Sequence, residues 1–159
     1  MNVRYESCPA EPVVFHEYAN LFPMLTGDAY DAFVEDVEAN GVQQPIVMLG
    51  NAILDGRNRY LAARQLGIEF PVTDYEGNDP LAFVISHNLA RRHLTESQRA
   101  MVASKLANLK KHDNQHTVDG QICPTTNANA ADMLNVSERS VNTARKVRTA
   151  GDDTLIGIC

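Results

Sequence analysis

A glycine and two arginines stand where the chain changes from an extended pattern to a helical one. These residues are Gly56, Arg57 and Arg59. The first backbone N–H groups of a helix have no acceptor within the helix and carry partial positive charge, so they attract phosphate. Arginine adds paired donors that match the spacing of phosphate oxygens. The residues therefore predict a phosphate-binding turn, and a tight turn followed by surface arginines is the alternative.

A second candidate site is the basic segment between residues 139 and 148. It contains four cations and no acid, the cations being Arg139, Arg145, Lys146 and Arg148. Positive charge gathered along one helix is the electrostatic footprint of contacts with nucleic-acid phosphates. The alternative is an ordinary helix face that water solvates.

The residues around this basic segment fit a helix-turn-helix at about 128–150. Small or apolar residues stand where its two helices must approach and pack, at Ala131, Leu134, Val136 and Val141. Asn135 tolerates the left-handed conformation of the turn, and Ser137 is a good cap for the second helix. The N-terminal residues of that helix would meet base edges, and its later cations would reach phosphates. An ordinary helical hairpin is the alternative. The predicted DNA-binding residues are Ser137, Arg139, Ser140, Asn142, Thr143, Arg145, Lys146 and Arg148.

Metal and disulfide chemistry are not indicated by the cysteines. Cys8, Cys123 and Cys159 are far apart, show no C-x-x-C spacing and have no histidine pair beside them. Zinc sites and disulfide frameworks have characteristic spacings that are missing here. We therefore interpret the three cysteines as free thiols and expect no metal site built from them.

The first half of the chain predicts helices and strands that would hold the glycine turn in place. Asp28 and Gly41 are suited to the N-cap and the end of a helix, and the apolar residues between them have helical spacing. Gly50 and Asn51 form a two-residue turn signal between apolar runs, which predicts a β-hairpin. Gly67 is a stop signal for the helix that follows the glycine turn. The apolar triplet 13–15 is a candidate strand. The other predicted elements of this half are hairpin strands at 45–49 and 52–55, a helix at 57–66 and a strand at 70–75.

The second half is predicted to be helical. Asp79 and Pro80 are an N-cap and a first helical residue, and Thr95 with Gln98 forms a capping box. Residues 112–126 combine glycine, proline and polar residues, so we expect a linker there.

Composition and charge divide the chain in two. Its 159 residues are 44% hydrophobic and carry a net charge of −6, which is typical of a folded globular protein. Residues 1–90 hold four Lys/Arg and thirteen Asp/Glu, whereas residues 91–159 hold ten and seven, so the basic charge is C-terminal. There is no apolar run of membrane-spanning length and no signal peptide at the N-terminus, so we expect a cytoplasmic protein.

Three motifs, in order, resemble those of ParB-type partition proteins. The stretch 54–62 resembles their G-E-R-R-[YF]-R-A box, 41–47 resembles the stretch that precedes the box, and 87–94 is similar to their E-N-L-Q-R-x-x-L motif. The resemblance covers roughly residues 13–150, since a helix and a helix-turn-helix follow as they do in that family. The chain thus resembles the ParB/sulfiredoxin-like superfamily.

This resemblance implies an α+β fold in which a small mixed β-sheet with helices precedes a helical helix-turn-helix region. It implies a nucleotide-binding domain at 1–90 and a DNA-binding region at 91–159. The partition proteins bind cytidine triphosphate with magnesium, so CTP or ATP is the expected cofactor here. The resemblance implies DNA, a nucleotide and a second copy of the chain, as a homodimer, as partners. The nucleotide-binding residues that it implies are Gly56, Arg59, Asn88 and Arg91, and Arg57 joins them from its place at the start of the helix.

The chain also departs from the family pattern. Arg57 and Asn58 replace the glutamate and first arginine of the box, and His87 replaces a glutamate that helps to hold the magnesium-bound triphosphate. A neutral imidazole is a poor ligand for magnesium, which prefers oxygen. Whether the chain hydrolyses a nucleotide, as a CTPase would, and whether it binds magnesium are therefore left open. No catalytic residue is assigned. The chain also ends soon after the second helix of the motif, without the separate dimerisation domain of partition proteins, so we expect a fragment or a shorter relative.

Three other interpretations belong to the same superfamily. Sulfiredoxin activity is rejected, because Arg57 stands where those enzymes have their catalytic cysteine. A small-molecule kinase or a nuclease is the enzyme alternative, since Asp55, Gly56, Arg59 and Tyr60 match the D-G-H-H-R-[YF] motif of free serine kinases. The last alternative is an interaction module with a degenerate nucleotide pocket. The leading interpretation is a DNA-binding, nucleotide-responsive protein of plasmid, phage or chromosome maintenance or regulation.

Overall fold

The fold is taken from a computed structural model that describes residues 3–7, 12–91, 94–112 and 126–150. The chain divides into two compact units, Met1–Ser86 and His87–Cys159, and each unit is described by itself. The three cysteines and most of the predicted linker lie outside the described residues. In the described part of the chain, no helix is long and apolar enough to cross a membrane.

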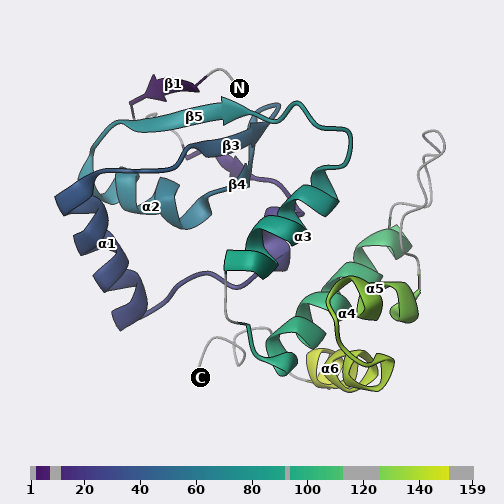
Figure 1. The fold of residues 1–159 in the computed structure, drawn as a ribbon. Helices are drawn as coiled ribbons and strands as arrows, with labels where there is room; N and C mark the ends of the chain where they lie inside the picture. Colours follow the sequence, from purple (N-terminus) through teal and green to yellow (C-terminus); the bar gives the residue numbers. More distant parts are fainter. Residues whose placement is uncertain (1–2, 8–11, 92–93, 113–125, 151–159) are drawn as a thin grey trace. The chain divides into compact units, whose positions relative to one another are not determined.

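The first unit contains a five-stranded mixed sheet with the order β1-β5-β3-β4-β2 (Figure 1). Parallel pairs join β2 to β4 and β3 to β5, and antiparallel pairs join β1 to β5 and β3 to β4. The arrangement confirms the predicted α+β class with a small mixed sheet. The strands are β1 (Val3–Glu6), β2 (Val14–Phe15), β3 (Ile46–Leu49), β4 (Ala52–Asp55) and β5 (Phe70–Asp74).

Two helices, α1 (Asp28–Asn40) and α2 (Arg57–Leu66), lie on one side of this sheet (Figure 1). Tyr60 and Ala63 of α2 pack on sheet residues, and Ala62 packs against α1, so α2 lies between the sheet and α1. A short 3-10 helix, η1 (Ala19–Leu21), precedes α1. The sheet residues of the central core are Ile46, Ile53, Phe70 and Val72.

Most of the predicted ends of helices and strands in this unit are confirmed. The hairpin β3–β4 turns at Gly50 and Asn51, where Gly50 has a φ of 58°. The predicted N-cap Asp28 is wrong by one residue. Gly27 is the N-cap of α1, and Asp28 is the first helical residue, where a carboxylate favours the positive end of the helix dipole.

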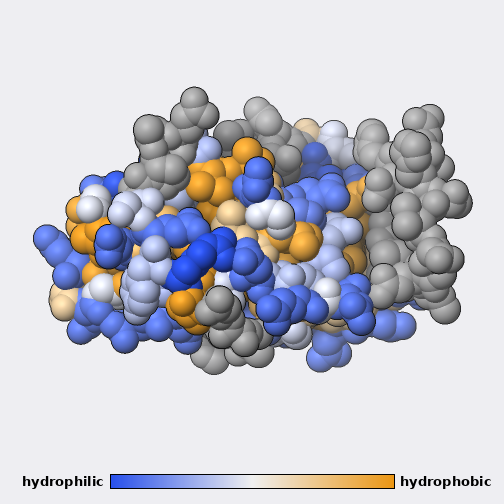
Figure 2. Space-filling model, turned by 90° about the horizontal axis from the view of Figure 1, so that it is seen from above, coloured by the Kyte–Doolittle hydropathy of each residue, from blue (hydrophilic) through white to orange (hydrophobic). Residues whose placement is uncertain are grey.

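The strand β1 was not predicted from the sequence. It forms an edge of the sheet through antiparallel pairing with β5, and Arg4 bonds Asp74 with its Nη1 2.5 Å from the Asp74 Oδ2. Val3 and Val14 leave apolar side chains exposed on the two edge strands. Figure 2 shows apolar residues in orange between hydrophilic residues in blue on the face that it draws. Scattered apolar residues of this kind are ordinary on protein surfaces.

The second unit is helical. After α3 (Pro80–Arg91), in which the division between the units falls, come α4 (Glu96–His112), α5 (Asn127–Met133) and α6 (Glu138–Ala150). The helix α4 packs against both α5 and α6. The buried residues of these three helices include Val102, Ala103, Leu106, Ala130, Ala131, Val141 and Ala144, together with Leu134 in the turn.

The predicted capping residues hold the helix starts in place. Asp79 accepts a hydrogen bond from the Ala82 N–H at 2.9 Å, so it caps α3 as expected. The capping box is reciprocal, because the Thr95 Oγ1 accepts from the Gln98 N–H at 3.2 Å and the Gln98 Oε1 accepts from the Thr95 N–H at 3.0 Å. These bonds satisfy amides that the helix leaves without partners.

Candidate functional site

The turn between β4 and α2 has the geometry that the sequence predicted. Gly56 lies between the end of β4 and the start of α2 with φ 104° and ψ 22°, a left-handed conformation that glycine adopts at little cost. It is the N-cap of α2 and supplies no side-chain cap. The first turn of α2 therefore begins at amides that no N-cap side chain covers, and such amides favour an anion.

The Arg59 side chain folds back over this turn. Its Nη2 lies 2.9 Å from the Asp55 Oδ2, and its Nη1 donates to the Gln44 Oε1 at 3.3 Å. A Cβ added to Gly56 would lie 2.9 Å from the Arg59 Nη2 and 3.0 Å from its Nε, so the guanidinium lies directly against the glycine. The Arg59 Nε is buried and has no hydrogen-bond partner among the residues that the structure describes. The guanidinium is thus held beside the start of α2 by its two Nη atoms, and its Nε makes none of these bonds.

Arg57 has a different position. Its Nη1 donates to the Asn20 Oδ1 at 2.8 Å, its Nη2 donates to the Phe22 carbonyl oxygen at 2.6 Å, and its guanidinium carbon lies 5.9 Å from the centre of the Phe15 ring. These contacts join the first turn of α2 to the segment that contains β2 and η1. Arg57 was predicted to bind phosphate, and the structure places it in contacts that hold this segment.

Two further residues of the same turn hold the segment, and the sequence analysis did not assign this role to them. Asn58 is buried, and its Oδ1 accepts from the Leu25 N–H at 3.3 Å. Tyr60 is 1% exposed, and its hydroxyl accepts from the Val13 N–H at 2.9 Å. The available signal was the helical spacing of Asn58 with the apolar residues Leu61 and Ala62, because a polar side chain buried among them needs a hydrogen-bond partner.

The other predicted nucleotide-binding residues belong to the second unit. Asn88 and Arg91 lie in the last turns of α3, and Asn88 is half-buried. The Arg91 side chain lies outside the described part of the chain. Gly56, Arg57 and Arg59 belong to the first unit. A single pocket formed by all five residues therefore stays a prediction.

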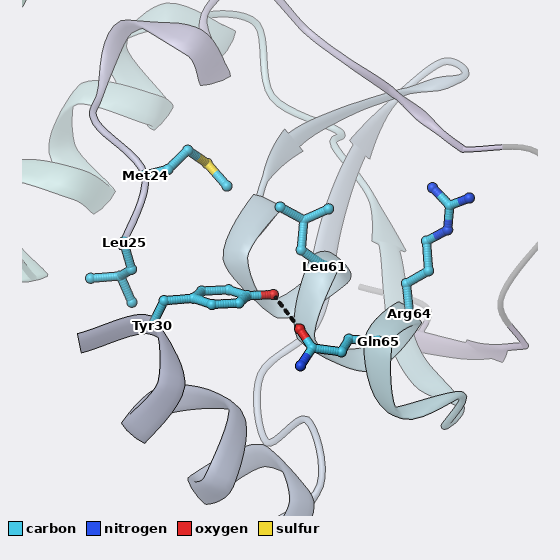
Figure 3. A pocket seen from close by; sticks show the side chains of 6 residues that line it. All are labelled: Met24, Leu25, Tyr30, Leu61, Arg64 and Gln65. Carbon is cyan, nitrogen blue, oxygen red and sulfur yellow. Dashed lines mark hydrogen bonds between the residues drawn. The ribbon is translucent and has the colours of Figure 1, made fainter. Parts of the chain in front are cut away.

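A depression of about 570 Å³ on the α1 and α2 side of the first unit was not predicted. Figure 3 shows Met24, Leu25 and Leu61 near the Tyr30 ring, whose hydroxyl lies 3.4 Å from the Gln65 Oε1. Burial raises the pKa of Tyr30, and the nearby Asp31 carboxylate adds to the rise. The depression is lined mainly by apolar side chains, with the side chain of Arg64 also contributing to its wall.

The helix-turn-helix has the predicted local geometry. Asn135, in the turn between α5 and α6, has a φ of 49°, which is the left-handed conformation expected of it. The Ser137 Oγ accepts from the Ser140 N–H at 3.0 Å and so caps α6 as predicted. Thr126 caps α5 in the same way, accepting from the Asn129 N–H at 3.2 Å. These bonds fix the turn that sets the direction of α6.

The structure separates the eight predicted DNA-binding residues into two groups. Five of them are exposed, namely Ser137, Arg139, Asn142, Thr143 and Lys146, and three are half-buried, namely Ser140, Arg145 and Arg148. Arg148 lies against α4, where its guanidinium meets the side-chain amide of Asn108. With the amide oxygen of Asn108 turned toward Arg148, that oxygen accepts hydrogen bonds from the Arg148 Nη1 and Nη2. Ser140 also contacts α4, because its Oγ donates to the Glu96 Oε1 at 3.0 Å. The outward face of α6 therefore carries two exposed cations, Arg139 and Lys146.

Among the residues that the structure describes, no three His, Cys, Asp or Glu side chains gather into a group that could hold a metal ion.

The two candidate sites are the turn at Gly56 with its arginines and the exposed face of α6. The first can attract an anion through backbone amides and a guanidinium. The second combines cations with small polar side chains on a capped helix.

Comparison with known proteins finds a solved structure with a similar fold. No protein-family model matches the chain, and no curated protein matches it. A solved Pnob8-like ParB-N domain is 14% identical, with a TM-score of 0.57 over 90% of this chain and 68% of that one. The C-terminally truncated chromosome-partitioning protein ParB from Caulobacter crescentus, in complex with the centromeric parS site, is 21% identical over 85% of this chain and 68% of that one, with a TM-score of 0.41. The likeness to the ParB-N domain confirms that this chain has a ParB-like α+β fold.

Proposed function

We propose that this chain binds DNA through the outward face of α6. The observation that carries the proposal is the capped helix-turn-helix whose second helix exposes Arg139 and Lys146 on either side of Asn142 and Thr143. Cations at the edges of such a face suit phosphates, and small polar residues between them suit base edges. The left-handed turn at Asn135 supports the same interpretation, because it gives the sharp change of direction that this motif needs.

The distribution of charge also supports DNA binding. The protein is acidic as a whole, with a net charge of −6, but residues 91–159 hold ten Lys/Arg and seven Asp/Glu. Each phosphate that a cation neutralises releases a counterion, so the affinity should fall steeply as salt rises. The acidic residues of the first 90 positions oppose non-specific attraction to DNA.

The test is a fluorescence-anisotropy titration of labelled duplex DNA at several salt concentrations with the full chain and the Lys146→Ala variant. The variant should bind all sequences more weakly, with a salt slope smaller by about one unit. Arg64→Ala is the matched control, since it also removes one exposed cation but lies in α2. Equal slopes for the Lys146 and Arg64 variants would contradict the assignment of α6, and undetectable binding by the folded chain would contradict DNA binding.

We also propose that the turn at Gly56 binds the phosphates of a nucleoside triphosphate, either CTP or ATP, which makes DNA binding responsive to a nucleotide. The support is the glycine N-cap of α2 together with the Arg59 guanidinium, whose buried Nε has no hydrogen-bond partner among the described residues. Arg57 contributes less in this proposal, because its bonds to Asn20 and Phe22 hold the segment that contains β2 and η1. Arg59 is the residue that we expect to meet the phosphates.

The test is a titration with labelled CTP and ATP, with and without magnesium, of the full chain and the Arg59→Lys variant. Lysine keeps the charge and loses the paired donors, so nucleotide affinity should fall while the fold is kept. Arg64→Lys is the matched control. Absence of binding to either nucleotide would leave the turn as a structural element and favour an interaction module.

Following the motif resemblance, we propose that this function belongs to plasmid, phage or chromosome maintenance or regulation. We also expect the chain to form a homodimer, which light scattering can check.

A further inference from the structure

Thr143 lies on the exposed face of α6 with its hydroxyl already bonded to its own helix. The Thr143 Oγ1 donates to the Arg139 carbonyl oxygen at 3.0 Å. A threonine that bonds the carbonyl four residues earlier has its one O–H donor committed to the helix backbone. The methyl group is therefore the part of this side chain that is available for an apolar contact.

A second apolar side chain lies one turn further along the same helix face. Val147 is 54% exposed and stands between Lys146 and Arg148 in the sequence. Residues four apart on a helix lie one above the other, so Thr143 and Val147 form a short apolar strip. Both residues also line a depression of about 490 Å³ between α4 and α6, together with Met101. The strip lies beside the exposed cation Arg139.

An apolar strip on a major-groove helix has one chemical counterpart among the bases. Thymine is the base that presents a methyl group in the major groove, next to its O4 acceptor, and a threonine methyl is one of its usual apolar contacts. Cytosine, guanine and adenine present hydrogen-bonding groups there. A threonine that presents its methyl group to the groove therefore favours thymine.

We propose that the Thr143 methyl group, with Val147 beside it, contacts the 5-methyl group of a thymine and makes the protein prefer thymine at one position of its DNA site. This inference rests on the proposed DNA binding by α6 and adds the chemical feature that α6 recognises. Arg139 and Lys146 hold the phosphates on this account, and the apolar strip reads the base.

The experiment starts by selecting duplexes that the full chain binds from a pool of random sequence. In the best duplex, each thymine is then replaced in turn by deoxyuridine, which keeps the base pair and the O4 acceptor and removes only the methyl group. At one position the affinity should fall about fourfold, as expected for one methyl group removed from an apolar contact.

The Thr143→Ser variant removes the matching methyl group from the protein and keeps the hydroxyl. It should bind the thymine duplex about fourfold more weakly and lose its discrimination against deoxyuridine at that position. Thr149→Ser is the matched control, because the Thr149 hydroxyl also bonds carbonyls of its own helix, those of Arg145 and Lys146. Thr149 lies about 120° away from Thr143 around the helix, so this variant should discriminate as the natural chain does.

The possible failures are distinguishable. Binding with a normal salt slope but with equal affinity for thymine and deoxyuridine at every position would overturn the thymine contact and leave the DNA-binding proposal standing. Discrimination that survives in Thr143→Ser would overturn the role of Thr143. Failure of the folded chain to bind any duplex of the pool would overturn both proposals.

Discussion

Gly56→Ala places a methyl group where the Arg59 guanidinium lies, and we expect it to destabilise the first unit by about 2–3 kcal/mol. One part, about 1–2 kcal/mol, is the strain of a left-handed conformation at a residue with a Cβ. The φ of Gly56 is 104°, so alanine cannot avoid this strain without moving the turn. A second part, about 1 kcal/mol, comes from moving Arg59 off its pair with Asp55.

The second part is a real loss because both partners are largely sheltered from water. The Arg59 and Asp55 side chains are 17% and 14% exposed, so their interaction is screened less than that of a surface ion pair. The new methyl group would lie 2.9 Å from the Arg59 Nη2, and the guanidinium must therefore shift. Removing Arg59 first would remove this part of the effect and leave the strain.

A double-mutant cycle with Arg59→Ala separates the two parts. Gly56→Ala should destabilise by about 2–3 kcal/mol in the natural chain and by about 1–2 kcal/mol in the Arg59→Ala chain, a coupling of about 1 kcal/mol. Urea unfolding followed by tyrosine fluorescence is the assay. All five tyrosines precede residue 87 and the chain has no tryptophan, so the signal reports the first unit.

Gly67→Ala is the matched control for this cycle. Gly67 also has a positive φ, 66°, but a Cβ added there would meet nothing within 4 Å. Its substitution should destabilise through strain alone and show no coupling with Arg59→Ala. If Gly56→Ala has the same effect with and without Arg59, the guanidinium does not lie against the turn, and the account of the candidate phosphate site is wrong.

Three further substitutions test individual contacts. Tyr60→Phe leaves the Val13 N–H without its acceptor, so the first unit should lose about 1–2 kcal/mol in the same urea assay. Ser137→Ala removes the cap of α6 and should lower helix stability by about 1 kcal/mol, measured by circular dichroism during thermal unfolding. Glu96→Gln keeps an acceptor for the Ser140 hydroxyl and removes a negative charge beside α6. Its DNA affinity should rise about twofold at low salt and the gain should fade at high salt, as anisotropy titrations can establish.

Local signals in the sequence predicted the local structure well. The capping box at Thr95 and Gln98, the left-handed Asn135 and the cap at Ser137 all involve residues within four positions of one another. Such features depend on residue type and spacing, which a sequence displays directly. The glycine turn at Gly56 was predictable for the same reason.

Contacts between distant segments were not predictable in this way. The strand β1 pairs with β5 and is tied by Arg4 to Asp74, 70 positions away, and no short-range pattern announces such a pairing. The sequence identified Arg57 as a donor, but it could not reveal that Asn20 and Phe22 occupy the ends of its guanidinium. The confirmed part of the candidate site is therefore its backbone geometry.

The inward position of Arg148 was missed although a signal existed. Arg148 is seven residues after Val141 and four after Ala144, so it continues the buried stripe of α6. The four cations are close together in the sequence, but helical spacing puts Arg148 on a different side of α6 from Arg139 and Lys146.

The most direct test of DNA recognition by α6 is an amide NMR titration of the isotope-labelled full chain with a selected duplex. We predict that the largest shift changes occur between Ser137 and Lys146, on the face that exposes Arg139, Asn142 and Thr143. Changes in α6 should weaken as salt is raised, because phosphate contacts release counterions. Binding with the α6 amides unchanged, or with the main changes in β1 and β5, would contradict the account.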